Sequence, residues 1–286
     1  MVSLVKNRKR FVLFNILSLL LFFTSAQAFA WTKSANFESG SVGSLAQGAS
    51  GFDYAGSATT FSSDKKASGS KSAKMLWPKG SEGWTIDHGE LNHSQSVTNG
   101  QEIWARGYYY FASPWSWANA GGAAGFIKIL RIHVANASGG NVGYLSFIAN
   151  ASGQIIASNE PADYGPVTGA KLDTDAWQCL EIYANLSTSS PVVRMWKNGV
   201  LIFEDTTHRT LSSTSDYANF SYIMTTWNGG APQNQTEYVD ELVVTTDKPS
   251  QVDSKGNRMI GLVNGTTPTP SPTLLAAPSG LRVTAK

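Results

Sequence analysis

The sequence predicts an all-β protein, built as a sandwich or barrel of short strands. From Trp31 onward, no amphipathic helical pattern exceeds about two turns. Short apolar or alternating runs recur instead, separated by Gly, Ser, Asn and Asp. Aromatic residues make up 11% of the chain and charged residues only 15%, which is typical of a packed β protein and argues against a coiled coil or a disordered chain.

Recurrent runs of this kind, each with β-forming residues, are typical of sandwiches and barrels. The predicted strands are Lys71–Trp77, Glu102–Phe111, Phe126–Val134, Gly143–Asn150, Gln154–Ser158, Trp177–Ala184, Val192–Lys197, Val200–Glu204, Phe220–Thr226 and Glu237–Thr245. Within this series, Asn198-Gly199 lies between two apolar runs, and this dipeptide is the strongest short-range signal for a β-hairpin.

Residues 1–30 have the pattern of a secretory signal peptide. Four Lys and Arg residues precede an apolar run that is short for a membrane span, and Ala-x-Ala cleavage options end at Ala28 or Ala30. An uncleaved membrane anchor is the alternative. Removing residues 1–28 takes away four basic residues and no acidic one, so the net charge changes from +2 to −2. We therefore predict a secreted protein that binds neither nucleic acid nor, after cleavage, a membrane.

The rest of the chain divides into one domain and a tail. The domain is predicted to span residues 31–246, followed by a polar linker over 247–276 that contains a Pro/Thr-rich run. Cys179 is the only cysteine, which excludes an internal disulfide and a CxxC metal site. Because it lies in an apolar run, we predict that it is a buried small hydrophobic residue.

The run Phe126–Val134 carries the candidate chemistry. In a strand, alternate side chains point to opposite faces, so Arg131 and His133 share one face, roughly 6–7 Å apart. Strict alternation puts Lys128 on the opposite, core-like face with Leu130. We predict that the face of Arg131 and His133 contacts a carbohydrate. An ordinary solvated sheet face is an equally weighted alternative.

Several stretches, in order, resemble known jelly-roll proteins. Asn36–Gly40 is similar to the opening strand of concanavalin A-like jelly rolls, and Ser72–Met75 to an early strand. Trp177–Tyr183 followed by Arg194–Gly199 resembles the W-x-x-x-E-x-Y … R-x-W-x-N-G hairpin of heparin lyase I-like and glucuronan lyase-like polysaccharide lyases. Tyr238–Val244 resembles their last strand.

This resemblance implies a concanavalin A-like jelly-roll sandwich of two antiparallel sheets, with one face that holds a glycan. Lyases of such families cleave acidic polysaccharides by β-elimination, which needs a cation for the uronate carboxylate, a base for the C5 proton and an acid for the departing oxygen. The implied roles are carboxylate binding for Arg131, the base for His133 and the acid for Tyr144. At the C-terminus, residues 277–286 resemble the start of a fibronectin type III module.

Further residues are candidates for substrate binding. Arg194 and Trp196 share a strand face, a pairing that suits anion binding plus sugar stacking, although a core Trp under an extended Arg is equally consistent. Trp115 and Trp117 flank a turn and are predicted to form an aromatic lip.

Two more candidates come from charged or titratable side chains near these runs. Lys128 lies in the same strand as Arg131, and His88 lies in a polar stretch that we interpret as a loop at the rim. Asp87, His88, Glu90 and His93 fit no standard metal-ligand spacing, so a plain loop is the favoured interpretation.

Glu38 and Asp240 are candidate ligands for a structural calcium ion. The resemblance implies adjacent first and last strands that hold Ca²⁺ with carboxylate and backbone oxygens, the ligands that calcium prefers. A surface carboxylate pair is the alternative. No organic cofactor is predicted.

The function predicted from the sequence is that of a polysaccharide lyase acting on an acidic glycan. A non-catalytic carbohydrate-binding or adhesive module is the first alternative, and a structural extracellular domain is the second. The E-x-D-x-x-E strand of laminarinase-like hydrolases is missing, which counts against hydrolysis. The sequence does not predict the oligomeric state.

Overall fold

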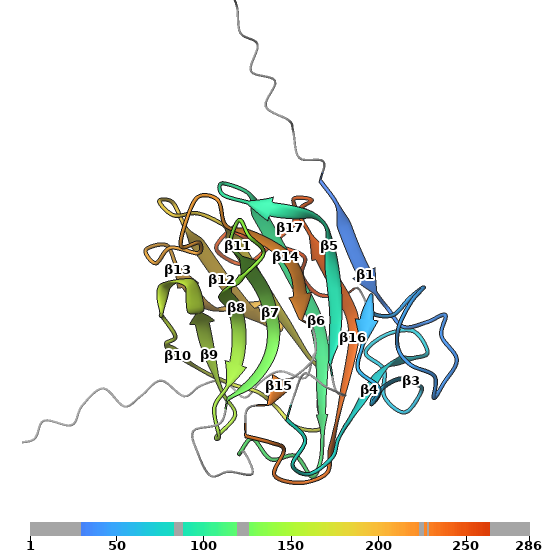
Figure 1. Ribbon diagram of the computed structural model, residues 1–286. Helices are drawn as coiled ribbons and strands as arrows, with labels where there is room; N and C mark the ends of the chain where they lie inside the picture. The colour runs from blue at the N-terminus through green and yellow to red at the C-terminus, as the bar shows by residue number, and fades with distance from the viewer. Residues whose placement is uncertain (1–29, 83–87, 119–125, 223–225, 228, 264–286) are drawn as a thin grey trace, which may run out of the picture.

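The protein is a sandwich of two large antiparallel sheets, which confirms the predicted all-β jelly roll (Figure 1). The computed structural model describes residues 30–82, 88–118, 126–222, 226–227 and 229–263. The predicted signal peptide up to residue 29 and the fibronectin-like stretch 277–286 lie outside these residues. No helix in the described part of the chain is long and apolar enough to cross a membrane.

The first sheet has eight strands. In spatial order they are β13 (Val200–Asp205), β12 (Val192–Lys197), β11 (Gln178–Asn185), β6 (Glu102–Ala112), β16 (Gln235–Thr245), β4 (Ser72–Trp77) and β3 (Thr59–Ser62), while β1 (Thr32–Ala35) also pairs with β16. The first strand, β1, lies beside β16, the last long strand, because it pairs with the C-terminal part of β16.

The second sheet also has eight strands. In spatial order they are β10 (Val167–Lys171), β9 (Gln154–Asn159), β8 (Asn141–Ala149), β7 (Ile127–Ala135), β14 (Tyr217–Tyr222), β5 (Gly89–Thr98) and β2 (Tyr54–Ala55), while β15 (Thr226–Trp227) pairs with β7. A 3-10 turn, η1 (Glu160–Ala162), follows β9, and a small ribbon joins β17 (Gln251–Val252) to β18 (Arg258–Met259).

The core lies between the two sheets. In β11, the alternate residues Leu180, Ile182 and Ala184 belong to the same apolar cluster as the fully buried Phe147 and Ile132 of the second sheet. Burying a large apolar side chain is worth about 1.5–3 kcal/mol, so this continuous apolar layer stabilises the fold without a disulfide. Cys179 is buried as predicted, and burial raises the pKa of its thiol to about 12.

The predicted hairpin forms between β12 and β13. Asn198 and Gly199 have φ values of 53° and 76°. Two positive φ values in succession match the twist of the flanking strands, and Asn-Gly is the dipeptide that adopts them most readily.

One long strand was not expected from the sequence. The stretch around His88 interpreted as a polar loop runs into the ten-residue strand β5, in which only Leu91 and Val97 belong to the apolar core. Its pairing with β14 on one side and β2 on the other holds this polar sequence in the sheet. Tertiary pairing therefore overrides a weak local pattern.

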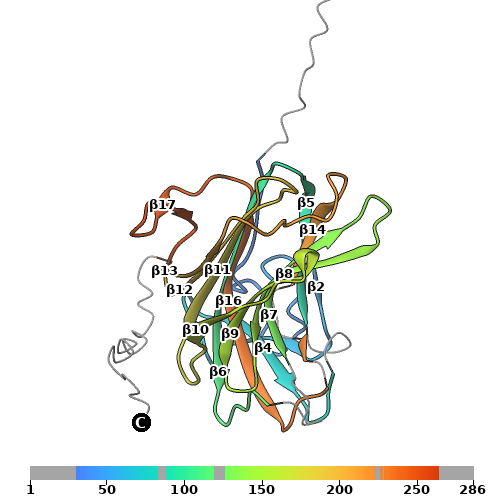
Figure 2. The same cartoon turned by 90° about the vertical axis from the view of Figure 1, so that its left-hand side faces the viewer.

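The chain after β16 packs on the outside of the first sheet, where Figure 2 shows β17. There Met259 joins Trp104, Tyr183 and Trp196 in a second apolar cluster. Trp196 Nε1 donates to Asp253 Oδ2 at 2.9 Å, and Trp104 Nε1 donates to the Arg258 carbonyl at 3.2 Å. The segment 248–263, called the back strap below, therefore packs against the first sheet. The packed structure continues beyond the domain boundary that the sequence predicted near Thr246.

Two buried charged residues bind the back strap to the sheet. The Glu181 carboxylate accepts hydrogen bonds from the backbone N–H groups of Ile260 and Gly261 at 2.5 and 2.9 Å. Arg106 donates to the carbonyl oxygens of Gly261 and Glu241 at 3.0 and 2.9 Å. Burial raises the pKa of Glu181 to about 7, against the opposing effect of its N–H donors and of Arg106.

Candidate functional site on the outer face of the second sheet

A β-bulge in β7 decides which side chains reach the outer face of the second sheet, the face that points away from the core. The register with β8 shifts between Lys128 and Arg131, and both intervening residues, Ile129 and Leu130, belong to the core. Lys128 is paired with Ile148, which lies outside the core cluster. The bulge therefore places Lys128 on the same face as Arg131, and the strict alternation expected from the sequence is wrong at this point.

Directly paired residues form a row across six strands of this face. Gly89 faces Phe52 in the core, so its neighbours His88 and Glu90 point outward. The same argument of alternation applies to Tyr54, whose neighbour Ala55 lies in the core. From β9 to β2, the row reads Ser158, Ser146, Arg131, Tyr222, Glu90 and Tyr54.

Arg131 lies at the centre of this row and is held on several sides. Its guanidinium carbon lies 3.5 Å from the centroid of the Tyr144 ring. Its Nε donates to Ser146 Oγ at 3.0 Å, and its Nη2 donates to Glu160 Oε1 at 2.5 Å. Only 5% of Arg131 is exposed, and this burial lowers its pKa, although Glu160 counters the effect. A fixed, desolvated guanidinium binds a carboxylate more strongly than an exposed one.

His133 lies two residues after Arg131 in β7 and is paired with Tyr144 of β8. Its ring stacks on Phe220 with centroids 4.3 Å apart. Nδ1 lies 2.6 Å from Asn219 Oδ1, and Nε2 lies 3.1 Å from Asn141 Oδ1. Burial lowers the pKa of His133, so the imidazole is neutral at pH 7 and able to accept a proton.

Tyr144 and Tyr222 complete the cluster. Their rings are 5.5 Å apart, and the Tyr144 ring is 5.0 Å from His133. Burial raises the pKa of Tyr222 well above its ordinary value, and a hydrogen bond with Tyr144 raises it further. Tyr222 therefore stays protonated, and its hydroxyl lies within hydrogen-bonding reach of Tyr144.

The structure thus brings Lys128, Arg131, His133 and Tyr144 together on one face. Arg131 and His133 are more covered than an exposed sheet face suggests, because aromatic and amide side chains of the same face pack around them. Tyr222 and Glu160 were missed by the sequence reasoning. The alternation Phe220-Ser-Tyr222 within a predicted strand could have indicated Tyr222, whereas Glu160 lies in a turn and carries no signal.

Arg194 and Trp196 lie on the opposite side of the molecule. They belong to the outer face of the first sheet, where Trp196 is only 1% exposed beneath the back strap. Arg194 pairs with Glu204 and lies 5.5 Å from the Tyr183 ring. Of the two alternatives given by the sequence, the structure shows the covered Trp, beside an Arg that pairs with its own hairpin, and the sugar-stacking pair is wrong.

Trp115 and Trp117 pack at one end of the core. Each ring centroid lies 4.8 Å from that of Phe111, and the two indoles are 5.5 Å apart. Both are half-buried and belong to the edge of the apolar core. This arrangement closes the end of the sandwich, and no described contact joins either Trp to Arg131 or His133.

His88 lies on the outer face, at the β2 edge of the row. It is 1% exposed, and its ring centroid lies 5.0 Å from that of Tyr54. His88 Nε2 lies 3.8 Å from Glu90 Oε1. Burial lowers the pKa of His88 and raises that of Glu90, so both groups favour their neutral forms.

Glu38 does not present the oxygen donors that calcium needs. Its carboxylate accepts hydrogen bonds from the backbone N–H groups of Ser70 and Lys71, at 2.9 to 3.1 Å. The ammonium group of Lys71 donates to the carbonyl oxygens of Glu38 and Gly40, both at 2.7 Å. A cation of the chain itself therefore lies against the backbone oxygens of this segment.

Asp240 is bound in a similar way by the other end of the same loop. Its Oδ2 accepts from the N–H groups of Ala67 and Ser68 at 2.9 and 3.2 Å, and its Oδ1 accepts from that of Glu241 at 2.8 Å. Among the described residues, no three His, Cys, Asp or Glu side chains converge as metal ligands. Six to eight oxygen ligands are typical for Ca²⁺, so this donor set does not fit the ion.

We therefore expect calcium chelation to leave the stability of the domain unchanged. EDTA should shift the Tm by less than about 1 °C, because no binding free energy is lost with the ion. Differential scanning calorimetry in EDTA and in millimolar CaCl₂ measures this. A Tm that rises by several degrees with calcium would show that the loop does hold the ion.

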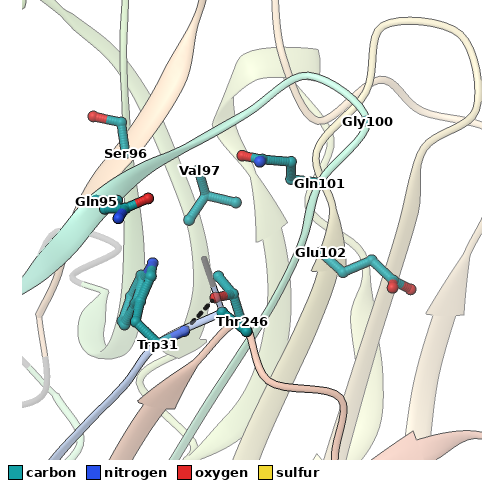
Figure 3. A pocket seen from close by; sticks show the side chains of 9 residues that line it. Trp31, Gln95, Ser96, Val97, Gly100, Gln101, Glu102 and Thr246 are labelled. Atoms are coloured by element: carbon teal, nitrogen blue, oxygen red, sulfur yellow. Dashed lines mark hydrogen bonds between the residues drawn. The ribbon is translucent and has the colours of Figure 1, made fainter. Parts of the chain in front are cut away.

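A separate pocket of ≈ 200 Å³ lies where β1 begins, beside the turn between β5 and β6 (Figure 3). Trp31, Gln95 and Gln101 line it. Its single carboxylate, Glu102, accepts a hydrogen bond from Tyr183 at 2.7 Å, and Figure 3 shows it turned away from the Trp31 ring. No Lys, Arg or His is among the described residues that line this pocket, so the outer face of the second sheet, where cations and proton-transfer groups meet, remains the candidate site.

Comparison with known proteins gives structural neighbours only. No protein-family model and no curated protein matches the sequence. The endo-β-1,4-glucuronan lyase from the fungus Trichoderma reesei superposes with a TM-score of 0.50 at 14% identity, covering 72% of this chain and 99% of that one.

Two alginate lyases give similar superpositions. Aly36B has a TM-score of 0.53 at 16% identity and covers 74% of this chain and 96% of its own. The marine PL-14 alginate lyase from Aplysia kurodai has a TM-score of 0.50 at 12% identity, with 65% and 86% covered. The chain therefore shares the jelly-roll fold of polysaccharide lyases.

Proposed function

We propose that this protein is a secreted polysaccharide lyase that cleaves a uronate-containing glycan by β-elimination on the outer face of the second sheet. The observation that carries the proposal is the meeting of two cations, a neutral imidazole and a hydrogen-bonded tyrosine pair on one face. The fold shared with glucuronan and alginate lyases supports the same substrate class.

Two cations would bind the uronate carboxylate. Arg131 is fixed by Tyr144, Ser146 and Glu160, and Lys128 lies near enough to Arg131 to have its own pKa lowered by burial and by that positive charge. An incoming carboxylate would share Arg131 with Glu160 and bring a second negative charge to Lys128. Neutralising the carboxylate makes the C5 proton of the sugar acidic enough to be removed.

His133 and Tyr144 would carry the proton transfers. His133 accepts the C5 proton through Nε2, whose partner Asn141 is exposed and able to move aside. Tyr144 gives its proton to the departing glycosidic oxygen, and the hydroxyl of Tyr222 stabilises the resulting phenolate. The C4–O bond breaks as the C4=C5 double bond forms, so the products are a new sugar end and an unsaturated uronate.

The unsaturated product makes the proposal directly testable. Purified protein incubated with alginate, glucuronan, pectin and heparinoids should generate ultraviolet absorbance from at least one of them. Retained binding to one of these polymers without any absorbing product would contradict the lyase and favour a binding module. The close packing around Arg131 and His133 is the observation that favours a binding module as the second candidate function. A lyase must bring its substrate to a catalytic base, whereas a binding module needs no such access.

A further inference from the structure

We propose that Tyr54 forms a distal sugar-stacking subsite for the same glycan, at the far end of the row that passes through Arg131. The inference rests on the proposed function, because it extends that site along the sheet. It assigns a binding role to an edge residue that the chemistry itself does not require.

The placement of Tyr54 is fixed by strand pairing. Tyr54 pairs with Glu90, Glu90 pairs with Tyr222, and Tyr222 pairs with Arg131. Three strand spacings of about 4.8 Å separate Tyr54 from Arg131, or roughly 14 Å along a line perpendicular to the strands. A glycan laid across the strands from Arg131 toward β2 would therefore reach the Tyr54 ring.

Tyr54 has the exposure and the support that a stacking residue needs. It is 50% exposed, and in the described part of the chain Phe126 is the only other aromatic residue among the exposed large hydrophobic ones. Its ring is backed by that of His88, which is itself 1% exposed, with a centroid distance of 5.0 Å and an angle of 37°. A rigid aromatic surface held in this way binds the apolar face of a sugar at a small cost in side-chain entropy.

The row between the two ends is continuous. Tyr222 lies 5.9 Å from the Arg131 guanidinium, and Glu90 fills the next position with 15% of its side chain exposed. The row thus has a cation at one end and an exposed aromatic ring at the other, with a largely buried phenol and carboxyl between them, so a glycan laid along it would be held mainly at its two ends. Isolated exposed aromatics are common on protein surfaces, and the position of Tyr54 in the row is what distinguishes it.

The test compares substrate lengths. We expect Tyr54→Ala to lower kcat/KM about tenfold for hexasaccharides of alginate or glucuronan, the loss expected for one stacking contact, and to leave trisaccharides within about twofold of wild type. Tyr54→Phe keeps the ring and should behave as wild type with both lengths. Where an oligosaccharide binds without being cleaved, its Kd replaces kcat/KM.

The outcomes separate the two proposals. If wild type cleaves hexasaccharides and Tyr54→Ala cleaves them equally well, or loses the same factor with trisaccharides, the subsite is overturned and the lyase stands. If wild type binds hexasaccharides without cleavage and Tyr54→Ala binds them more weakly, the subsite stands and the lyase fails. A wild-type protein that neither cleaves nor binds them overturns both. Equal melting temperatures of the three proteins show that the edge strand is intact.

Discussion

The variant His133→Gln is expected to lose about 10²- to 10⁴-fold in the rate of unsaturated product formation, the range that general-base catalysis contributes. Glutamine keeps a polar side chain between Asn141 and Asn219, but it cannot take up a proton at neutral pH. The glycan should still bind, because Arg131 and Lys128 are untouched. The loss should therefore appear in kcat rather than in KM.

The matched control is His208→Gln. His208 lies outside the candidate site, where its Nδ1 is 3.0 Å from Asp205 Oδ2 and its ring stacks on Tyr164. Rates within about twofold of wild type are expected for this control, since surface changes away from a site have small effects. If His133→Gln folds with an unchanged Tm and keeps more than a tenth of wild-type activity, His133 is not the base.

The pH dependence of the wild-type enzyme offers an independent check on the same residue. Because burial lowers the pKa of His133 below its ordinary value of 6.5, the imidazole stays neutral at pH values where an exposed histidine is already protonated. Activity should therefore persist below pH 6.5 and fall only as the pH drops through the lowered pKa. An acid limb centred above pH 6.5 in kcat/KM would contradict the assignment.

The sequence was sufficient to predict the sandwich, because hydrophobic alternation and the Asn198-Gly199 turn are local signals. It was also sufficient to predict that Arg131 and His133 share a face. It failed for Lys128, since a bulge is a property of two paired strands and one strand's alternation does not reveal it. The core membership of both Ile129 and Leu130 is the structural sign of that bulge.

The largest difference between the sequence prediction and the structure concerns the surroundings of Trp196. Arg-x-Trp alternation predicts that both side chains share a face, and they do, but alternation cannot say what covers that face. The cover comes from residues 248–263, whose polar and Gly-containing composition is typical of a linker. Their packing depends on single long-range contacts, such as that between Trp196 and Asp253, that leave no periodic pattern in the sequence.

The contacts between the back strap and the first sheet predict that the domain is destabilised by truncation at residue 246, the end predicted from the sequence. A chain of residues 30–246 should be less stable than one of residues 30–263 by roughly 3–6 kcal/mol, because Met259 is lost and three large aromatic side chains are partly exposed. For a domain of this size the Tm should fall by about 10 °C or more. Thermal unfolding of the two chains, followed by circular dichroism, measures the difference.

The pH dependence of that difference tests whether Glu181 is part of the cause. In the longer chain the pKa of Glu181 is raised to about 7 by burial, from an ordinary value of 4.5. A raised carboxyl pKa stabilises the folded state fully below pH 4.5, and this contribution is lost as the pH rises to about 7. Truncation exposes Glu181 and removes the dependence, so the stability gap should be wider at pH 5 than at pH 8. Glu181→Gln in the longer chain should flatten the change, whereas equal Tm values for both chains at either pH would show that the back strap does not stabilise the domain.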